Sequence, residues 1–157
     1  MIRTGLGFDA HAFDAARSLV LGGVTIPDTP GLAGHSDADA LSHAIADALL
    51  GAAGLGDLGE RFPASDEWKD ASSLDILREC ASVTRAAGWS ITNADATIVA
   101  ERPRLAAYRY GMIENLAAAL GIPGDRVSVK ATTTDGMGFT GRGEGIGVLA
   151  VVTISAD

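Results

Sequence analysis

Three side chains near the start of the sequence have the types and spacing needed to bind a divalent transition metal. Asp9 lies in residues 2–10, a segment that reads as a β-strand, and His11 follows two positions later. Side chains at i and i+2 of a strand point to the same side, so both can reach one ion. His43 lies on a predicted helix, about 200° around the axis from the apolar Leu41. Two nitrogens and one carboxylate, with a fourth place open, form the ligand set of a catalytic zinc site.

The spacing alone leaves other interpretations of these residues open. Two exposed histidines and some acids on a helix surface need have nothing to do with one another. The grouping of His11, His35 and His43 within the first 43 residues favours a site. Asp39 and Asp47 flank His43 at four residues on either side, and we expect Asp47 to accept a hydrogen bond from its second ring N–H.

A second enzyme class uses the same ligand set. Two histidines and a carboxylate also hold iron in non-haem oxygenases. Those sites usually lie on an antiparallel barrel, which the helix-rich pattern of this sequence does not support. The metal bound by protein purified without added iron separates the two classes.

Later in the chain, residues 130–135 could contact a phosphate group. Lys130 and the three threonines that follow Ala131 offer a charge and several N–H and O–H donors at the end of a predicted strand. The alternative is an ordinary strand with threonines chosen for β-propensity. Residues 140–145, TGRGEG, could be a turn with a surface ion pair between Arg142 and Glu144. Neither a Walker loop nor a G-x-G-x-x-G nucleotide fingerprint follows the first strand.

Composition narrows the class of protein. The 157 residues are 47% hydrophobic, enough for one core, and we expect a single catalytic domain over residues 1–157. A net charge of −8 argues against nucleic acid as a partner. No apolar stretch reaches the roughly 18 residues of a membrane span, and the N-terminus has no signal-peptide core. With Cys80 as the single cysteine, these features predict a cytoplasmic protein without membrane attachment.

Strands alternate with helices along the sequence. We expect strands at 2–10, 18–27 (or a hairpin arm), 90–100, 126–133 and 145–155, and helices at 37–54, 72–87 and 105–120, with a loop at 56–71. Asp37 is the expected N-cap of the first helix, and Ser72 with Asp75 resembles a capping box for the second. The order predicts an α/β (α+β) fold with helices packed on one face of a mixed sheet. Because the last strand is apolar on both faces, we expect the other face to pack in a homotrimer.

Five segments together resemble one family. GFDAH (7–11), GHSDADALSHAIADALLGA (34–52), GDLGERFP (56–63), KATTTD (130–135) and GFTGRGEGI (138–146) have the order and spacing of 2-C-methyl-D-erythritol 2,4-cyclodiphosphate synthases. The resemblance covers nearly the whole chain. It implies a homotrimeric, metal-dependent phosphorus–oxygen lyase of the non-mevalonate isoprenoid pathway. Such an enzyme converts 4-diphosphocytidyl-2-C-methyl-D-erythritol 2-phosphate into the cyclic diphosphate and releases CMP.

The resemblance also implies roles for individual residues. It implies Zn²⁺ on Asp9, His11 and His43, and Mg²⁺ or Mn²⁺ on Asp135 with the substrate phosphates. The active sites would lie between adjacent chains. The expected catalytic residues are His35, Lys130, Thr134 and Asp135. The expected substrate-binding residues are Asp9, His11, His35, Ser36, Asp57, Gly59, Ser73, Ala100, Pro103, Arg104, Ala131, Thr132, Thr133, Phe139 and Arg142.

Three positions depart from the family pattern without removing a zinc ligand. Asp135 stands where the family commonly has a longer Glu, Arg104 replaces a frequent Lys, and Ala64 stands where an Asp is usual. A rival outside the enzymes is a small-ligand binding protein or a trimeric assembly module. It predicts nucleotide binding without CMP release.

Overall fold

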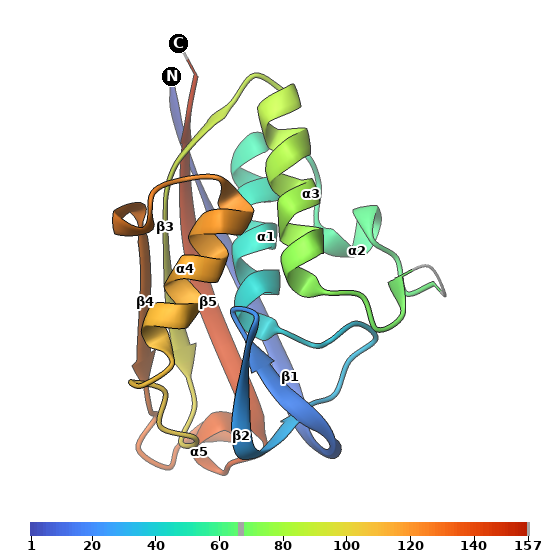
Figure 1. Ribbon diagram of the computed structural model, residues 1–157, viewed down its shortest axis with the longest axis vertical. Coiled ribbons are helices and arrows are strands. Elements are labelled where there is room, and N and C mark those ends of the chain that lie inside the picture. The colour runs from blue at the N-terminus through green and yellow to red at the C-terminus, as the bar shows by residue number, and fades with distance from the viewer. Residues whose placement is uncertain (66–67, 157) are drawn as a thin grey trace.

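The computed structural model describes residues 1–65 and 68–156 (Figure 1). Five strands form one mixed sheet in the order β2-β1-β5-β3-β4. Neighbouring strands are antiparallel except β3 and β4, which run parallel. The strands are β1 (Ile2–Leu21), β2 (Val24–Leu32), β3 (Ser90–Val99), β4 (Val127–Thr132) and β5 (Gly145–Ser155).

Three longer helices cover one face of this sheet, as Figure 1 shows. They are α1 (Ala40–Ala53), α3 (Ser73–Ala86) and α4 (Arg109–Leu120), and the short helices are α2 (Leu58–Arg61), the 3₁₀ turn at Gly124–Arg126 and α5 (Gly138–Gly141). The predicted α+β class, with helices on one side of a mixed sheet, is confirmed.

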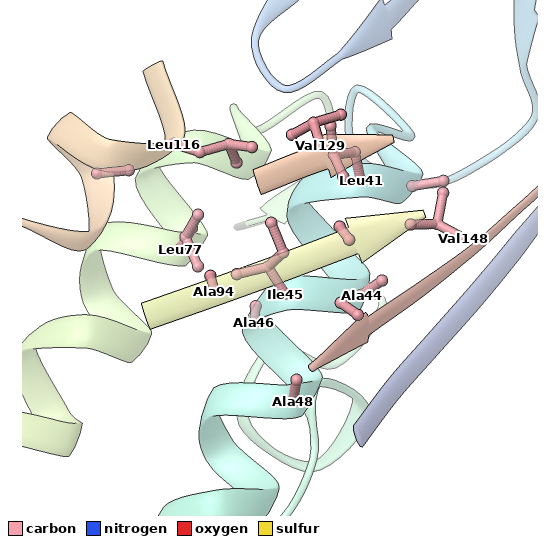
Figure 2. Packing of buried hydrophobic residues seen from close by; sticks show 14 of the residues in the cluster. Leu41, Ala44, Ile45, Ala46, Ala48, Leu77, Ala94, Leu116, Val129 and Val148 are labelled. Carbon is pink, nitrogen blue, oxygen red and sulfur yellow. The ribbon is translucent and has the colours of Figure 1, made fainter. Parts of the chain in front are cut away.

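Helix α1 lies at the centre of the core and packs on β1, β5 and α3. Figure 2 shows its Leu41 and Ile45 among side chains from α3, α4 and the sheet, including Leu77 and Leu116. Among the residues of α1, only His43, Asp47 and Gly51 escape full burial. These three are four residues apart, so the helix opens to solvent along one narrow line.

Two glycines allow α1 to lie directly on β1. A Cβ atom at Gly7 would lie 1.9 Å from the carbonyl oxygen of Ala44, and one at Gly5 would lie 1.9 Å from that of Ala48. No side chain fits in that space, because these atoms belong to the helix backbone. Since strand side chains alternate, Asp9 lies on the same side of β1 as the two glycines and faces the same helix.

The elements differ from expectation in four of the predicted segments, the first being the strand expected at 2–10, which continues to Leu21. Residues 18–27 contain both arms of a hairpin, because Gly22 and Gly23 have positive φ angles and turn the chain between β1 and β2. The expected loop at 56–71 contains α2, and the expected helix at 105–120 begins only at Arg109. Before Arg109, a turn at Leu105 supplies the buried apolar residue that extended the helical pattern.

The caps of α1 and α3 also differ from those expected. Asp39, not Asp37, is the N-cap of α1, and its carboxylate accepts the backbone N–H of Ser42. Ser72 occupies the N-cap position of α3 but makes no capping bond with its side chain. Instead the carboxylate of Asp37 accepts the backbone N–H of Ser73 at 3.0 Å. Asp37 therefore caps the second helix from a distant loop.

The face of the sheet opposite the helices carries exposed apolar side chains. Leu6 and Phe8 of β1 are 68% and 57% exposed, and the other large ones on β1 and β5 are Ile2, Leu149 and Val151. A row of this kind is costly in water unless another surface covers it. The prediction that the last strand is apolar on both faces is confirmed. In the described ranges, no helix has the length and apolar character needed to cross a bilayer.

Replacing Gly7 with Ala should destabilise the fold, because the new methyl group collides with the backbone of α1. We expect a loss of about 3 kcal/mol in the free energy of unfolding, the cost of overpacking a core. Gly51→Ala is the matched control, since a Cβ there meets nothing within 4 Å and should add about 0.5–1 kcal/mol through helix propensity. Urea denaturation at equal protein concentration measures both, and unchanged stability in Gly7→Ala would contradict the contact.

Candidate metal site

Asp9, His11 and His43 meet at one end of the contact between β1 and α1. The Oδ2 atom of Asp9 lies 2.8 Å from Nε2 of His11 and 3.2 Å from Nδ1 of His43. One ligand atom from each residue can be chosen so that all three lie within 4.8 Å of one another. The structure thus brings together the three residues that the spacing singled out.

The remaining nitrogen of each ring is held by the protein. Nδ1 of His11 donates to the carbonyl oxygen of Ala33 at 2.6 Å. Nε2 of His43 lies 2.9 Å from Oγ of Ser73 and 3.2 Å from Oγ of Ser36. Each contact directs a different ring nitrogen toward the cluster, Nε2 in His11 and Nδ1 in His43.

Electrostatics favour a charged carboxylate at Asp9. Burial raises the pKa of Asp9, but hydrogen bonds from His11 and His43 outweigh it and lower the pKa to about 2. The hydrogen bond to Asp9 raises the pKa of His11, against the opposing effect of burial. Without a metal, the cluster is therefore a carboxylate that attracts protons onto its neighbouring imidazole.

The three residues fit a tetrahedral metal ion with one open position. Ligands about 2.0 Å from zinc at tetrahedral angles lie about 3.3 Å apart, close to the two separations from the Asp9 carboxylate. Both histidines also have the outer hydrogen-bond partner that metal-bound imidazoles usually have. A divalent transition metal would gain a preformed set of donors here.

A pocket of about 270 Å³ opens beside the cluster. His35 lies in its wall and contacts the carbonyl oxygen of Ser65 through Nε2 at 2.6 Å. Phe62 and Trp68 meet edge to face, with ring centroids 4.8 Å apart, and give the pocket part of its apolar lining. The other lining residues are Ser36, Asp47, Leu58, Gly59, Ala64 and Ile76.

The expected role of Asp47 was wrong, and Asp39 does not share the face of His43. Asp47 accepts the backbone N–H of Leu58 at 2.8 Å, at the start of α2, while serines occupy the second nitrogen of His43. Asp39 is fully buried and accepts N–H groups of Gly22 and Gly23 at 2.9 and 2.8 Å, besides two bonds from Ser42. Burial raises its pKa, and these four hydrogen bonds oppose the shift.

The residues expected at a nucleotide lie together in a second pocket of about 270 Å³. It is lined by Ala100, Glu101, Pro103, Arg104, Leu105, Ala106, Arg109, Ala131, Thr132 and Thr133. Glu101, which the sequence did not single out, accepts the N–H groups of Thr134 and Gly136 at 3.2 Å and holds the following loop. Among the residues that the structure describes, none lines both this pocket and the one beside the metal cluster. The two sites are therefore separate within one chain.

Several expected site residues lie outside both pockets. Lys130 pairs with Asp95 of the neighbouring strand, and the Thr134 hydroxyl contacts Met137 O and Thr140 Oγ1 inside its own loop. Asp57 caps α2 through the N–H of Glu60. The roles expected for these side chains stay predictions.

Three further expected residues lie on or near the surface around these pockets. Asp135 has a positive φ of 51° and contacts Thr133. Phe139 lines a shallow pocket with His11, and Arg142 forms the expected ion pair with Glu144 at 2.7 Å. Their roles at the substrate also stay predictions.

Comparisons with known proteins agree on one family. The model of the YgbB family matches residues 2–155. The 2-C-methyl-D-erythritol 2,4-cyclodiphosphate synthase of Moorella thermoacetica is 58% identical over 98% of this chain and 94% of its own length. The synthase of the same name from Syntrophomonas wolfei is 54% identical over 98% of each chain.

Solved structures show the same likeness. The bifunctional IspDF of Campylobacter jejuni matches with a TM-score of 0.96 and 43% identity, over 100% of this chain, which spans 43% of that chain. IspF of Plasmodium falciparum, solved as a CDP complex, matches with a TM-score of 0.87 and 31% identity, over 99% of this chain and 97% of that one.

Metal binding by the metal-free protein should weaken as the pH falls. A ligating histidine must be neutral, so the metal displaces a proton from any His11 that carries one. Because the pKa of His11 is raised above 6.5, the weakening should begin above that pH and approach about tenfold per pH unit below the shifted pKa. Calorimetric titration with Zn²⁺ at about pH 8 and about pH 6 measures it. Equal affinities at both would contradict the assignment of His11 as a ligand.

Proposed function

We infer the function of this chain from the family to which it belongs, the YgbB family. Its activity is that of a 2-C-methyl-D-erythritol 2,4-cyclodiphosphate synthase, the name shared by relatives at 51–58% identity. It cyclises 4-diphosphocytidyl-2-C-methyl-D-erythritol 2-phosphate and releases CMP, in the non-mevalonate pathway to isoprenoid precursors. The observation in the structure that carries this function is the cluster of Asp9, His11 and His43 beside a pocket.

The reaction is an intramolecular phosphoryl transfer. An oxygen of the 2-phosphate forms a bond to the β-phosphorus, and the bond from that phosphorus to the bridging oxygen breaks, so that CMP leaves with the electron pair. A phosphate monoester has a second pKa of about 6 and is already largely ionised at neutral pH. The protein therefore needs no general base, and its task is to position the two phosphates and offset their charge.

We propose that Zn²⁺ occupies the Asp9–His11–His43 cluster. A zinc ion there would act as a Lewis acid toward a phosphate oxygen. Within the chain, His35 and the backbone beside Ser36 would orient the transferred phosphate, since they line the same pocket. The apolar wall of Phe62 and Trp68 would exclude water, which strengthens every charge interaction inside the site.

The nucleotide half of the substrate is proposed to bind in the second pocket. Arg104 at its rim would supply positive charge, and the Thr132 and Thr133 segment would supply N–H and O–H donors to the phosphates. Asp135, on the loop held by Glu101, would help to bind Mg²⁺ or Mn²⁺. Asp is one methylene shorter than Glu. Because Mg²⁺ keeps several of its waters, a water molecule can bridge the gap between Asp135 and the ion.

We propose that three chains assemble and that each active site is shared by two of them. Two observations support this. The metal pocket and the nucleotide pocket share none of the described residues within a chain, and the open face of the sheet exposes Leu6 and Phe8. A closed ring of three sheets would bury that face and bring one chain's metal side to the next chain's nucleotide side. We also propose that the protein is located in the cytoplasm.

Replacing His43 with Ala should abolish CMP release and lower bound zinc well below one per chain. Among the described residues, three side chains offer ligands to the cluster, so the loss of one leaves too few donors. His35→Ala is the informative comparison, because His35 lines the pocket without being a ligand and its loss should spare the zinc content. Zinc analysis and a CMP assay on the cytidine-linked substrate measure both. Full turnover by His43→Ala after chelator treatment would sink the metal assignment, and binding of substrate by the parent without CMP release would favour the binding-protein rival.

Shared sites can be tested by mixing two inactive chains. One carries His43→Ala and the other Asp135→Ala, so each lacks a different half of the proposed site. If sites form between chains, dissociating and reassociating an equal mixture should make about a quarter of the sites intact, since each half is intact with a probability of about one half. CMP release should then return to about that fraction. A mixture as inactive as its components, or a monomer by light scattering, would contradict sharing.

A further inference from the structure

We propose that Asp37 is a positioning residue for the metal site, acting through Ser73 on the outer nitrogen of His43. This inference rests on the proposed metal site and adds a carboxylate that does not touch the metal. Asp37 lies in the loop before α1, and Ser73 is the first residue of α3, so three separate segments meet at His43.

The contacts form a continuous chain of hydrogen bonds. The Oγ atom of Ser73 lies 2.9 Å from Nε2 of His43 and also bonds Oδ1 of Asp37. The second oxygen of Asp37 accepts the backbone N–H of Ser73 at 3.0 Å. Asp37 therefore accepts two hydrogen bonds from Ser73, one from its N–H and one from its O–H. These bonds restrict rotation of the serine hydroxyl away from His43.

The direction of these bonds follows from the groups themselves. A carboxylate only accepts, so the hydroxyl hydrogen of Ser73 points to Asp37. The lone pairs of the same oxygen then face His43, which must donate from Nε2–H. When a metal takes the place of the hydrogen bond between Nδ1 and the Asp9 carboxylate, which lie 3.2 Å apart, an imidazole protonated at Nε2 presents its Nδ1 lone pair to the ion. Asp37 thus favours the Nε2–H tautomer of His43, whose Nδ1 can bind the metal. It also makes Nδ1 a stronger metal ligand.

The loop that carries Asp37 is held in an unusual backbone conformation. Ala38 is fully buried with a positive φ of 57°, a region that costs free energy for any residue other than glycine. Asp37 and Asp39, on either side of this residue, bond different partners. Asp39 holds the hairpin turn between β1 and β2, and Asp37 holds α3.

Ser36 is a weaker candidate for the same role. Its Oγ atom lies 3.2 Å from Nε2 of His43, and it accepts the backbone N–H of Ala38 at 3.2 Å. It is farther from the imidazole than Ser73 is. Ser36→Ala should therefore lower metal affinity less than Ser73→Ala.

The first test compares Asp37→Asn with Asp75→Asn. The N–H and the O–H of Ser73 bond different oxygens of Asp37, and an amide replaces one of these oxygens with an NH₂ group that cannot accept, so we expect zinc affinity to fall about tenfold. Asp75 is an exposed acid in the first turn of the same helix, paired with Arg78, and its change to Asn removes the same charge. That control should stay within about twofold of the parent. Competition with a chelator, without substrate, measures both.

The second test separates the relay from helix capping. Ser73→Ala removes the hydroxyl but keeps the backbone N–H that Asp37 accepts, so α3 stays capped while zinc affinity falls. Ser73→Thr restores a hydroxyl and should recover most of the loss. Co²⁺ added in place of zinc gives a visible spectrum that should change in Asp37→Asn and Ser73→Ala and stay unchanged in Asp75→Asn. In the double variant the two losses should not add, because both break one chain of bonds.

The outcomes separate this inference from the proposed function. If the parent binds zinc and His43→Ala does not, but Asp37→Asn and Ser73→Ala bind as the parent does, the relay is wrong and the metal site stands. An equal loss in Asp37→Asn and Asp75→Asn would show a general effect of charge and would also overturn the relay. A parent that binds no zinc would overturn both.

Discussion

The metal cluster depends on the direct contact of helix α1 with strand β1. Gly5 and Gly7 remove the side chains that would hold the helix away, and the carbonyl oxygens of Ala44 and Ala48 occupy the space. Asp9 lies two residues after Gly7, on the same side of the strand. The contact that packs the core therefore also places the Asp9 carboxylate 3.2 Å from Nδ1 of His43. An added methyl group at Gly7 would disturb both the packing of α1 on β1 and the distance between Asp9 and His43. Core packing and ligand spacing are in this sense one constraint.

Around that contact, acids meet the needs of buried backbone groups. Burying the Asp39 carboxylate is costly, and four hydrogen bonds from the hairpin turn and from Ser42 offset the cost. These bonds fix the start of α1 one turn before His43. Asp37 does the same for α3 and its Ser73. The conformation of the His35–Asp39 segment thus follows from the acids on each side of Ala38. The imidazole of His43 is held on its outer side by Ser73, which Asp37 fixes and which does not line the pocket.

Much of this could be predicted from the sequence, because local patterns encode it. Apolar and alternating residue patterns predicted a strand in each of the five regions where the structure has one, and the i and i+2 spacing joined Asp9 to His11. The resemblance grouped the residues of the second pocket, from Ala100 to Thr133. The caps were harder, because Asp37 and Asp39 both suit an N-cap and only the position of the hairpin turn decides between them. The role of Asp47 was wrong because the N–H of Leu58 belongs to α2, which was expected to be loop. The glycine contact depends on where α1 lies, and spacing along the chain does not report it.

The most direct test of the proposed zinc site is anomalous scattering at the zinc absorption edge from crystals of the purified protein. We expect one peak per chain in the cluster. It should come from a zinc ion that is bonded, at about 2.0–2.2 Å, to a carboxylate oxygen of Asp9, to Nε2 of His11 and to Nδ1 of His43. The electron-density map from the same crystals should show Nε2 of His43 turned toward Ser73. A peak bonded to Nε2 of His43, a peak at His35, or no peak in the cluster would contradict it.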